Sequence, residues 1–221
     1  METEARTRSV EQVLRLMQKS RTSRPPFKLP YTYDEVRTML CHGIAYEVEY
    51  RHREFSLNDS VKKVVNEAAA FLTNGKKFGL LVSGLPGNGK TTLLRAIQNL
   101  INTVMMKDYY GQDFAVRIYT AQDIVRFAKT KTDLFKQICE CPALAIDDLG
   151  EEPLEVLVYG NSINPLIELL SYRYDKQLLT MATTNTANDK IRANYGDRIA
   201  DRLNEMMQVI IFTNPSYRTQ S

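Results

Sequence analysis

The eight residues 84–91, GLPGNGKT, have the types and spacing of a loop that binds the phosphates of a nucleotide. The three glycines let the backbone turn tightly, so that successive N–H groups can face phosphate oxygens. Lys90 would place a positive charge beside the β- and γ-phosphates, and the Thr91 hydroxyl would ligate Mg²⁺. The alternative is a glycine-rich turn that contains Lys-Thr by chance. We expect Mg²⁺ and ATP to bind at Gly84, Leu85, Pro86, Gly87, Asn88, Gly89, Lys90, Thr91 and Thr92.

The segments on both sides of this loop are those that a phosphate loop requires. The apolar run 80–82 precedes it and is typical of a strand. Apolar residues then recur at helical spacing from Leu93 to Ile101. A helix that begins at the loop directs the positive end of its dipole at the bound anion, which adds to the attraction of Lys90.

Two adjacent carboxylates, Asp147 and Asp148, follow the apolar run 143–146. Such a run without alternation is typical of a strand buried on both faces of a parallel sheet, whose carboxyl end opens on the ligand site. Carboxylates at that end are costly unless they meet a cation. We expect Asp147 to hold Mg²⁺, directly or through water, and Asp148 to orient and deprotonate the attacking water. The alternative is an incidental acidic strand end.

Polar residues follow two later elements. Asn185 ends the strand-like run 178–184 and could contact the γ-phosphate or the lytic water, or cap the next helix. A predicted helix over 196–203 carries Arg198 and Arg202, four residues apart. The five expected strands lie at 80–82, 114–119, 143–146, 178–184 and 208–212.

Composition limits the class of protein. A chain of 221 residues suits one domain with an appendage or two small domains. The three cysteines and two histidines match no zinc spacing, and an odd cysteine count argues against a disulfide framework, so we expect reduced thiols in the cytoplasm. The charged N-terminus lacks the apolar core of a signal peptide, and no apolar run approaches 18 residues. We expect no membrane association.

The N-terminal region is expected to be an extension. Residues 9–20 form an amphipathic helical pattern with Val10, Val13, Leu14 and Met17 on one stripe. Pro25 and Pro26 then impose a semi-rigid linker. The stripe must be buried either on the protein's own core or on a partner. Residues 1–30 carry seven basic and three acidic side chains, which favours nucleic acid or an acidic partner there, although a solvated helix face explains the charges equally well.

Residues 31–56, the second half of the extension, contain no motif that indicates their role. Residues 31–53 suggest one or two short helices to which we assign no function. A helix capped by Asn58, Asp59 or Ser60 and ending near Gly75 then begins the main domain. We therefore divide the chain into an extension at 1–56 and a main domain at 57–221.

The order and spacing of the motifs resemble the AAA+ ATPases, and specifically the DnaC/IstB-like group of bacterial helicase loaders and transposition helper ATPases. The resemblance covers residues 60–218. It rests on GLPGNGKT at 84–91, YTAQDI at 119–124, LAIDDLG at 144–150, TTN at 183–185, YGDRIADRL at 195–203 and SYR at 216–218.

This resemblance implies an α/β P-loop NTPase fold with a parallel five-stranded sheet of order 5-1-4-3-2 between helices. It implies that Asn185 is sensor 1 and that Arg202 is an arginine finger offered to a neighbouring subunit. Arg198 and Arg218 are further candidates for phosphate contact, and Arg198 or Arg173 would be the next candidate finger. In this group the N-terminal region binds the partner protein.

Two departures from the wider AAA+ pattern affect the expected activity. Asp148 stands where many members have Glu, one methylene longer, so we expect turnover to be slow. The sequence continues for only nine residues after the fifth predicted strand, which leaves no room for a helical C-terminal lid, so that a lid-borne sensor arginine is missing unless Arg218 substitutes for it.

The leading hypothesis is an ATP-hydrolysing loader or helper that binds single-stranded DNA and a replicative helicase or transposase. ATP would hold its subunits together in a homo-oligomer. One alternative is an adaptor that senses ATP without useful hydrolysis. Another is a small-molecule P-loop kinase, which Asn185 and Asp148 favour less because both suit activation of water.

Overall fold

The computed structural model describes residues 8–20, 25–108, 111–158, 161–214 and 216–217. Its centre is a five-stranded parallel sheet in the order β2-β3-β6-β1-β7. When these strands are numbered one to five along the chain, the order is 5-1-4-3-2, so the fold prediction is confirmed. The strands are β1 (Gly79–Gly84), β2 (Val116–Thr120), β3 (Ala143–Asp147), β6 (Leu179–Thr184) and β7 (Met207–Phe212).

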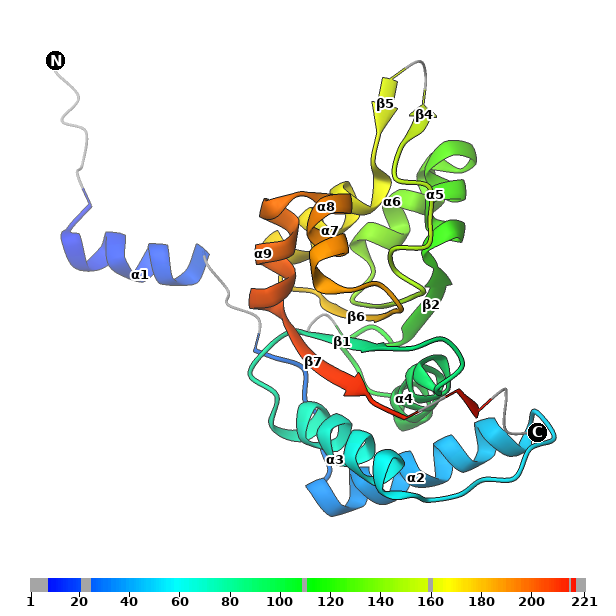
Figure 1. Ribbon diagram of the computed structural model, residues 1–221. Coiled ribbons are helices and arrows are strands. Elements are labelled where there is room, and N and C mark those ends of the chain that lie inside the picture. Colours follow the sequence, from blue (N-terminus) through cyan, green and yellow to red (C-terminus); the bar gives the residue numbers. More distant parts are fainter. Residues whose placement is uncertain (1–7, 21–24, 109–110, 159–160, 215, 218–221) are drawn as a thin grey trace, which may run out of the picture.

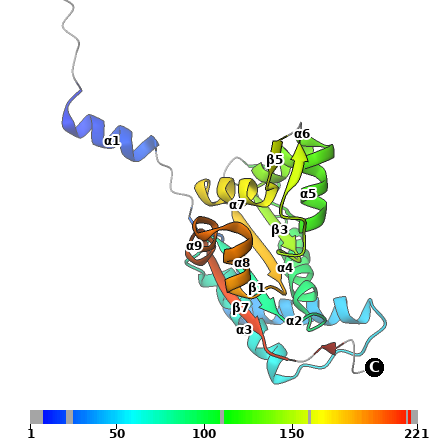
Figure 2. The same cartoon turned by 45° about the horizontal axis from the view of Figure 1, so that its top comes forward.

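Two layers of helices cover the faces of this sheet (Figures 1 and 2). One layer contains α2 (Tyr33–Glu49), α3 (Asp59–Asn74) and α4 (Lys90–Val104). The other contains α5 (Ala121–Thr130), α6 (Thr132–Glu140), α7 (Pro165–Asp175), α8 (Asn188–Tyr195) and α9 (Asp197–Met206). A short antiparallel hairpin of β4 (Val156–Val158) and β5 (Asn161–Ile163) projects from the second layer in Figure 1.

The alternation of side chains along β3 shows how the two layers are built. Ala143 and Ala145 belong to the hydrophobic cluster formed with α2, α3 and α4, whereas Leu144 and Ile146 belong to the cluster formed with α5, α6 and α7. Successive strand residues point to opposite faces, so a strand covered on both sides must be apolar throughout. Every residue of β3 is buried, as the unbroken apolar run predicted.

Polar side chains fix where the helices begin. The Asn58 side chain accepts a hydrogen bond from the Val61 N–H and caps α3, one of the three caps predicted there. The Asn164 side chain caps α7, whose first turn contains Pro165. Proline is tolerated there because the first N–H groups of a helix have no partner within the helix.

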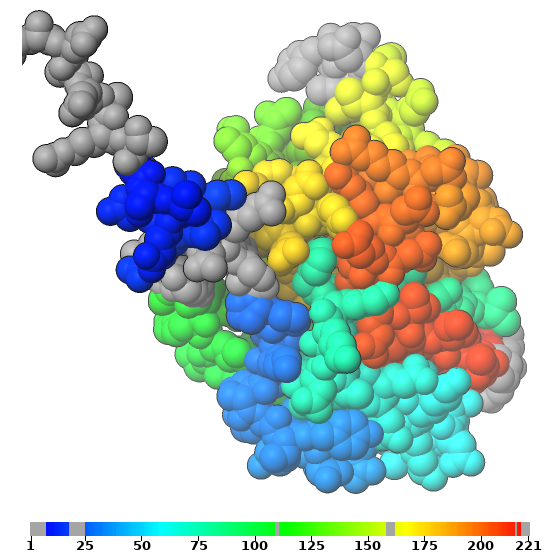
Figure 3. Space-filling model, turned by 90° about the vertical axis from the view of Figure 1, so that its left-hand side faces the viewer, coloured from blue at the N-terminus to red at the C-terminus, as the bar shows by residue number. Residues whose placement is uncertain are grey.

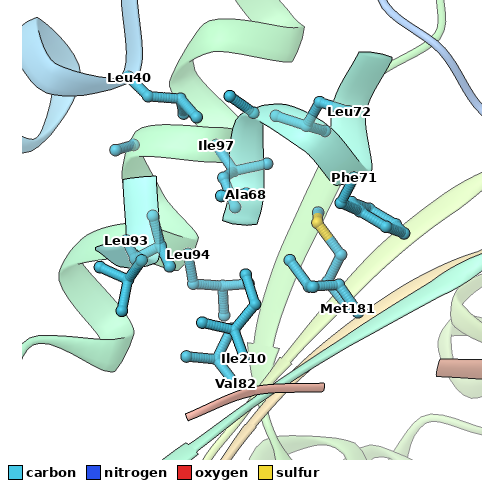
Figure 4. Close-up of a cluster of buried hydrophobic side chains, with 14 of the residues drawn as sticks. Leu40, Ala68, Phe71, Leu72, Val82, Leu93, Leu94, Ile97, Met181 and Ile210 are labelled. Carbon is cyan, nitrogen blue, oxygen red and sulfur yellow. The ribbon is translucent and has the colours of Figure 1, made fainter. Parts of the chain in front are cut away.

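The first cluster extends further toward the N-terminus than the proposed division at residue 57. Val36, Leu40 and Ile44 of α2 are buried in the same cluster as α3 and α4. Figure 4 shows Leu40 beside the side chains from α3, α4 and the sheet. An added Cβ at Gly43 would lie 3.3 Å from the Ala96 Cβ, so α2 and α4 approach closely there. Helix α2 therefore packs as part of the main body, although the sequence suggested an extension up to residue 56.

Helix α1 (Val10–Ser20) is the part that lies away from this body (Figures 1 and 2). The stripe of Val10, Val13, Leu14 and Met17 is exposed, and Leu14 is 54% accessible. Of the two predicted ways to bury the stripe, folding back on the core is not what the structure shows. Within the described part of the chain, no helix combines the length and apolar character needed to cross a membrane.

Candidate nucleotide-binding site

A cavity of about 1040 Å³ opens at the carboxyl ends of β1, β3 and β6. Its wall contains most of the predicted phosphate loop together with Asp147, Asp148 and Asn185. Because β1, β3 and β6 are neighbours in a parallel sheet, the segments that follow them meet at one edge. The strand order thus brings together residues that are far apart in the sequence. From the loop and the first turn of α4, the lining residues are Pro86, Gly87, Asn88, Gly89, Lys90, Thr91 and Thr92.

The phosphate loop has the backbone that its glycines predicted. Gly87 and Gly89 have φ angles of 79° and 104°, values that favour glycine. Gly84 and Leu85 are not among the lining residues, and their carbonyls accept hydrogen bonds from the Lys90 Nζ at 2.8 and 2.7 Å. These contacts hold the ammonium group beside the loop. Its charge is therefore available to an anion that the loop binds.

Asp147 is hydrogen-bonded to both sides of the site. Its Oδ1 accepts from the Thr91 hydroxyl at 3.0 Å and from the Thr183 hydroxyl at 2.6 Å. Thr183 lies in β6, and its Oγ1 also accepts from the Asp148 N–H at 2.9 Å. The phosphate loop, β3 and β6 are thus joined through a single carboxylate. Sequence reasoning placed Thr183 in a motif but gave it no role, because the pairing of β3 with β6 is a long-range feature.

The donor set fits Mg²⁺. In proteins this ion is bound by one or two carboxylates together with substrate phosphates and water. Asp147 supplies one carboxylate and Thr91 supplies a hydroxyl, and these two groups are already in contact. The described residues contain no cluster of three or more His, Cys, Asp or Glu side chains able to hold a metal.

Asp148 and Asn185 lie beside this carboxylate in the cavity wall. Asp148 has φ of 57°, a left-handed conformation that is uncommon outside glycine and that Asp tolerates better than most residues. The buried Asn185 Oδ1 has no hydrogen-bond partner among the described residues. A buried amide oxygen without a donor is costly, so a water or ligand that donates to it would stabilise the site.

Comparison with known proteins shows which solved structures share this fold. No protein-family model and no curated protein matches the sequence. The solved structures similar to the chain include the DnaC helicase loader, with 22% identity and a TM-score of 0.55 over 72% of this chain and 93% of that chain. DnaI has 23% identity and a TM-score of 0.54 over 72% of this chain and 88% of its own. The fold is that of the DnaC-like AAA+ proteins.

A third AAA+ structure was determined with ligands. It is the replication initiator DnaA bound to AMPPCP and single-stranded DNA, with 17% identity and a TM-score of 0.50 over 72% of this chain and 47% of that chain. AMPPCP is an ATP analogue. The AAA+ fold of the present chain is therefore one that in DnaA accommodates a nucleotide.

The two arginines of α9 lie outside this cavity. Arg198 is exposed, and neither it nor Arg202 is among the residues that line the wall. Arg202 forms an ion pair with Asp175 at 3.1 Å, and its guanidinium lies 4.6 Å from the centre of the Tyr174 ring. Both partners are at the C-terminal end of α7, which leads into the amino end of β6. Arg202 is thus near the edge of the sheet opposite the phosphate loop, and Figure 3 shows α9 at the molecular surface.

Two other predicted arginines have different outcomes. Arg173 is completely buried, so its suggested use as a substitute arginine finger is wrong. Arg218 lies outside the described residues. Its neighbour Tyr217 lines the cavity, where its backbone N–H donates to the Gly87 carbonyl at 3.0 Å. Tyr217 therefore contacts the phosphate loop, while the role of Arg218 stays a prediction.

A buried pair connects the loop after β3 to α8. The Tyr195 hydroxyl donates to the Glu152 carboxylate, whose other oxygen accepts from the Gly150 N–H at 2.9 Å. Burial and the neighbouring Glu152 raise the pKa of Tyr195, so its hydroxyl remains a donor at neutral pH. Sequence reasoning missed this pair, because nothing in the local pattern distinguishes Glu152 from the exposed Glu151 beside it.

Proposed function

We propose that this chain binds ATP with Mg²⁺ and hydrolyses it. The observation that carries the proposal is the contact of Thr91 and Thr183 with the same oxygen of Asp147, at the wall that also contains Asp148 and Asn185. Thr91 and Asp147 would hold Mg²⁺, which would neutralise charge on the β- and γ-phosphate oxygens. Lys90 would add its charge at the same phosphates.

The remaining groups suit the activation of water. Asp148 would accept a proton from the attacking water, and the Asn185 Oδ1 would accept a second hydrogen bond and so orient that water. Arg202 would act on the γ-phosphate of a neighbouring subunit in a homo-oligomer, because it lies away from the chain's own cavity. These roles require the groups that the structure brings together, plus a second copy.

We propose further that hydrolysis serves an ATP-switched loader or helper. Such a protein would bind single-stranded DNA and a replicative helicase or transposase. The support is the fold shared with the DnaC helicase loader and with DnaA bound to single-stranded DNA, together with the exposed apolar stripe of α1. An exposed apolar stripe beside basic residues suits a protein partner at the N-terminal arm.

A second candidate is an ATP-sensing adaptor without useful hydrolysis. The observation that favours it is Asp148, which has a shorter side chain than Glu and a left-handed backbone. A shorter base reaches the attacking water less well. Both candidates predict nucleotide binding, so only turnover distinguishes them.

The test measures ATP affinity and ATPase rate, with and without single-stranded DNA, in the wild type and three variants. Lys90→Ala should remove binding without unfolding the protein, because its charge serves the phosphates. Asp148→Asn should keep Mg-ATP binding and lower turnover at least roughly 100-fold, the size of a general-base contribution. Lys136→Ala, an exposed lysine on α6, is the matched control. Wild-type affinity in Lys90→Ala would overturn the binding site, and wild-type turnover in Asp148→Asn would overturn the assigned base.

A further inference from the structure

A second cation, Arg51, lies in the nucleotide cavity on the side opposite Lys90's loop. It follows the end of α2 and lines the cavity together with Thr92. Its Nη1 donates to the Thr92 Oγ1 at 2.9 Å, across a separation of 41 residues. Thr92 is in the first turn of α4, directly after the Thr91 that would ligate Mg²⁺. A guanidinium group is thus positioned at the start of the phosphate-binding helix.

The packing of α2 on α4 holds Arg51 in this place. Gly43 and Ala96 are in close approach, while Arg51, further along the chain, meets Thr92, which precedes Ala96. The two helices therefore run in opposite directions, and the C-terminal end of α2 is directed at the N-terminal turn of α4. Their shared core contacts fix this arrangement. Arg51 consequently belongs to the rigid body that carries the phosphate loop.

The turn after α2 is shaped to expose this side chain to the cavity. The N–H groups of Arg51 and Arg53 donate to the Val48 carbonyl at 3.1 and 3.3 Å. Between them, His52 has φ of 56°, a left-handed value that is unfavourable for a residue other than glycine. Such strain persists where surrounding contacts impose it and is common at ligand sites. The turn directs Arg51 to Thr92 and Arg53 to the Tyr217 carbonyl at 3.3 Å.

The charge of Arg51 is only partly compensated within the chain. Its ion pair is with Glu47, whose carboxylate lies 3.8 Å from Nη2, which is too long for a hydrogen bond. Its contact with Thr92 is with a neutral hydroxyl. Arginine carries five N–H donors in a planar fork that suits phosphate oxygens. The group is therefore able to accept an anion in the cavity.

The chemistry of the cavity wall indicates which phosphate this would be. Lys90, Thr91 and Asp147 form the end suited to the β- and γ-phosphates and Mg²⁺. Apolar side chains from α2 and α3 form another part of the wall, suited to a base: Ile44, Val48, Val61 and Val64. Arg51 emerges from the apolar side and reaches α4 one residue beyond Thr91. It therefore lies between the two parts, where the phosphate nearest the nucleoside would be.

We propose that Arg51 binds the α-phosphate of the nucleotide and so helps retain ATP and ADP alike. This inference rests on the proposed nucleotide binding. It gives the segment 31–56, to which the sequence alone assigned no function, a role inside the nucleotide site. Because charge on the α-phosphate changes little when the γ-phosphate is transferred, Arg51 should contribute equally to substrate binding and to the transition state. Its loss should then raise KM and leave kcat nearly unchanged.

The experiment compares Arg51→Met with Arg37→Met, a matched removal of an arginine charge from an exposed position on α2. Dissociation constants for Mg-ATP and Mg-ADP are measured by titration calorimetry, with thermal unfolding in the absence of nucleotide as a check on folding. Arg51→Met should weaken both nucleotides by the same factor, about 10- to 100-fold, as expected for a hydrogen bond to a charged group. Arg37→Met should stay within about twofold of the wild type, since Arg37 does not line the cavity and its ion pair is with the exposed Asp34.

Each result decides the proposal. Affinities within about twofold of the wild type in Arg51→Met, or a loss confined to ATP, would overturn it. If Arg51→Met does not fold, Arg51→Gln, which keeps a donor for Thr92 and removes the charge, is subject to the same expectation. If wild-type protein binds neither nucleotide, the proposed function itself fails. If the wild type binds both and the Arg51 variants match it, only the role of Arg51 fails.

Discussion

Two arginines on neighbouring helices are held in opposite ways. Arg173 of α7 is fully buried, and its guanidinium donates to the Cys141 carbonyl at 2.9 Å, the Leu179 carbonyl at 2.6 Å and the Thr180 hydroxyl at 2.8 Å. Arg202 of α9 has one ion pair with Asp175, and its buried Nη1 has no partner among the described residues. The guanidinium of Arg173 thus has acceptors on all sides within the chain, whereas one N–H group of Arg202 has no acceptor among the described residues.

The difference separates a structural cation from a candidate functional one. Burial lowers the pKa of Arg173 to about 10, so the group is still charged at neutral pH and can hold the strand ends at Cys141 and Leu179 together. The unused donor of Arg202 is itself buried and its side chain is 15% exposed, so the guanidinium would reach a phosphate of a neighbouring subunit only after its pair with Asp175 opens. The predictions that follow test whether this contrast is one of function or only of burial.

The largest effect is expected for Arg202→Ala. Acting as a trans finger, Arg202 would contribute about 10³–10⁵ in hydrolysis rate, so the variant should bind ATP normally and hydrolyse it poorly. Mixing it with Lys90→Ala protein should restore activity above the sum of the two, because some interfaces then combine an intact phosphate loop with an intact arginine. ATPase assays over a range of mixing ratios measure this. Mixed assemblies on native gels that show only the summed activity would mean that Arg202 does not act in trans.

Arg173→Met should instead reduce stability. It leaves several buried carbonyl oxygens without a donor, at about 1–3 kcal/mol each, so the free energy of unfolding should fall by at least about 3 kcal/mol. Urea denaturation of Arg173→Met and Arg202→Met compares the same substitution at both sites. Arg202→Met should lose less than about 1 kcal/mol, since its ion pair is with an exposed carboxylate. Equal losses would remove the contrast.

A smaller effect is expected for Tyr195→Phe, in the turn that leads to α9. The variant keeps the ring but leaves the Glu152 carboxylate without its hydroxyl donor, which should cost about 1–3 kcal/mol of unfolding free energy. A double-mutant cycle with Glu152→Gln isolates the pair. Strict additivity of the two losses would show that the pair contributes no coupling between the loop after β3 and the α8–α9 region.

The smallest effect on the nucleotide site is expected from deletion of residues 1–20. The deletion stops there because Leu29 is buried in the first core cluster and its N–H donates to the Leu72 carbonyl at 2.8 Å. Helix α1 lies apart from the body, so ATP affinity and turnover should match those of the full chain (Figure 1). Binding of a replicative helicase or transposase should be lost, which pull-down with purified candidates would show. A loss of ATP binding on deletion would contradict this and would mean that the N-terminal arm contributes to the nucleotide site.

Local motifs made the centre of the site predictable. The phosphate loop needs only eight consecutive residues, and Asp147 and Asn185 each follow a recognisable apolar run. Arg51 and Thr183 could not be found in this way, because Arg51 reaches Thr92 across 41 residues and Thr183 meets Asp147 only through strand pairing. Arg173 and Arg202 also look alike in sequence. Their burial and partners distinguish them, and both depend on how α7 packs against the sheet and α9.

The position of β1 in the sheet has a consequence for synthesis of the chain on the ribosome. β1 is the first strand made, yet its two neighbours are the last: Gly79 pairs with Thr180 on one side and with Met207 on the other. One edge of β1 therefore remains unpaired until β6 has emerged, and the other until β7 has emerged. The phosphate loop is complete only when the segment with Tyr217 has joined Gly87. Nascent chains should thus acquire nucleotide affinity only after Tyr217 has emerged, and pairing across such long separations should make the sheet slow to form.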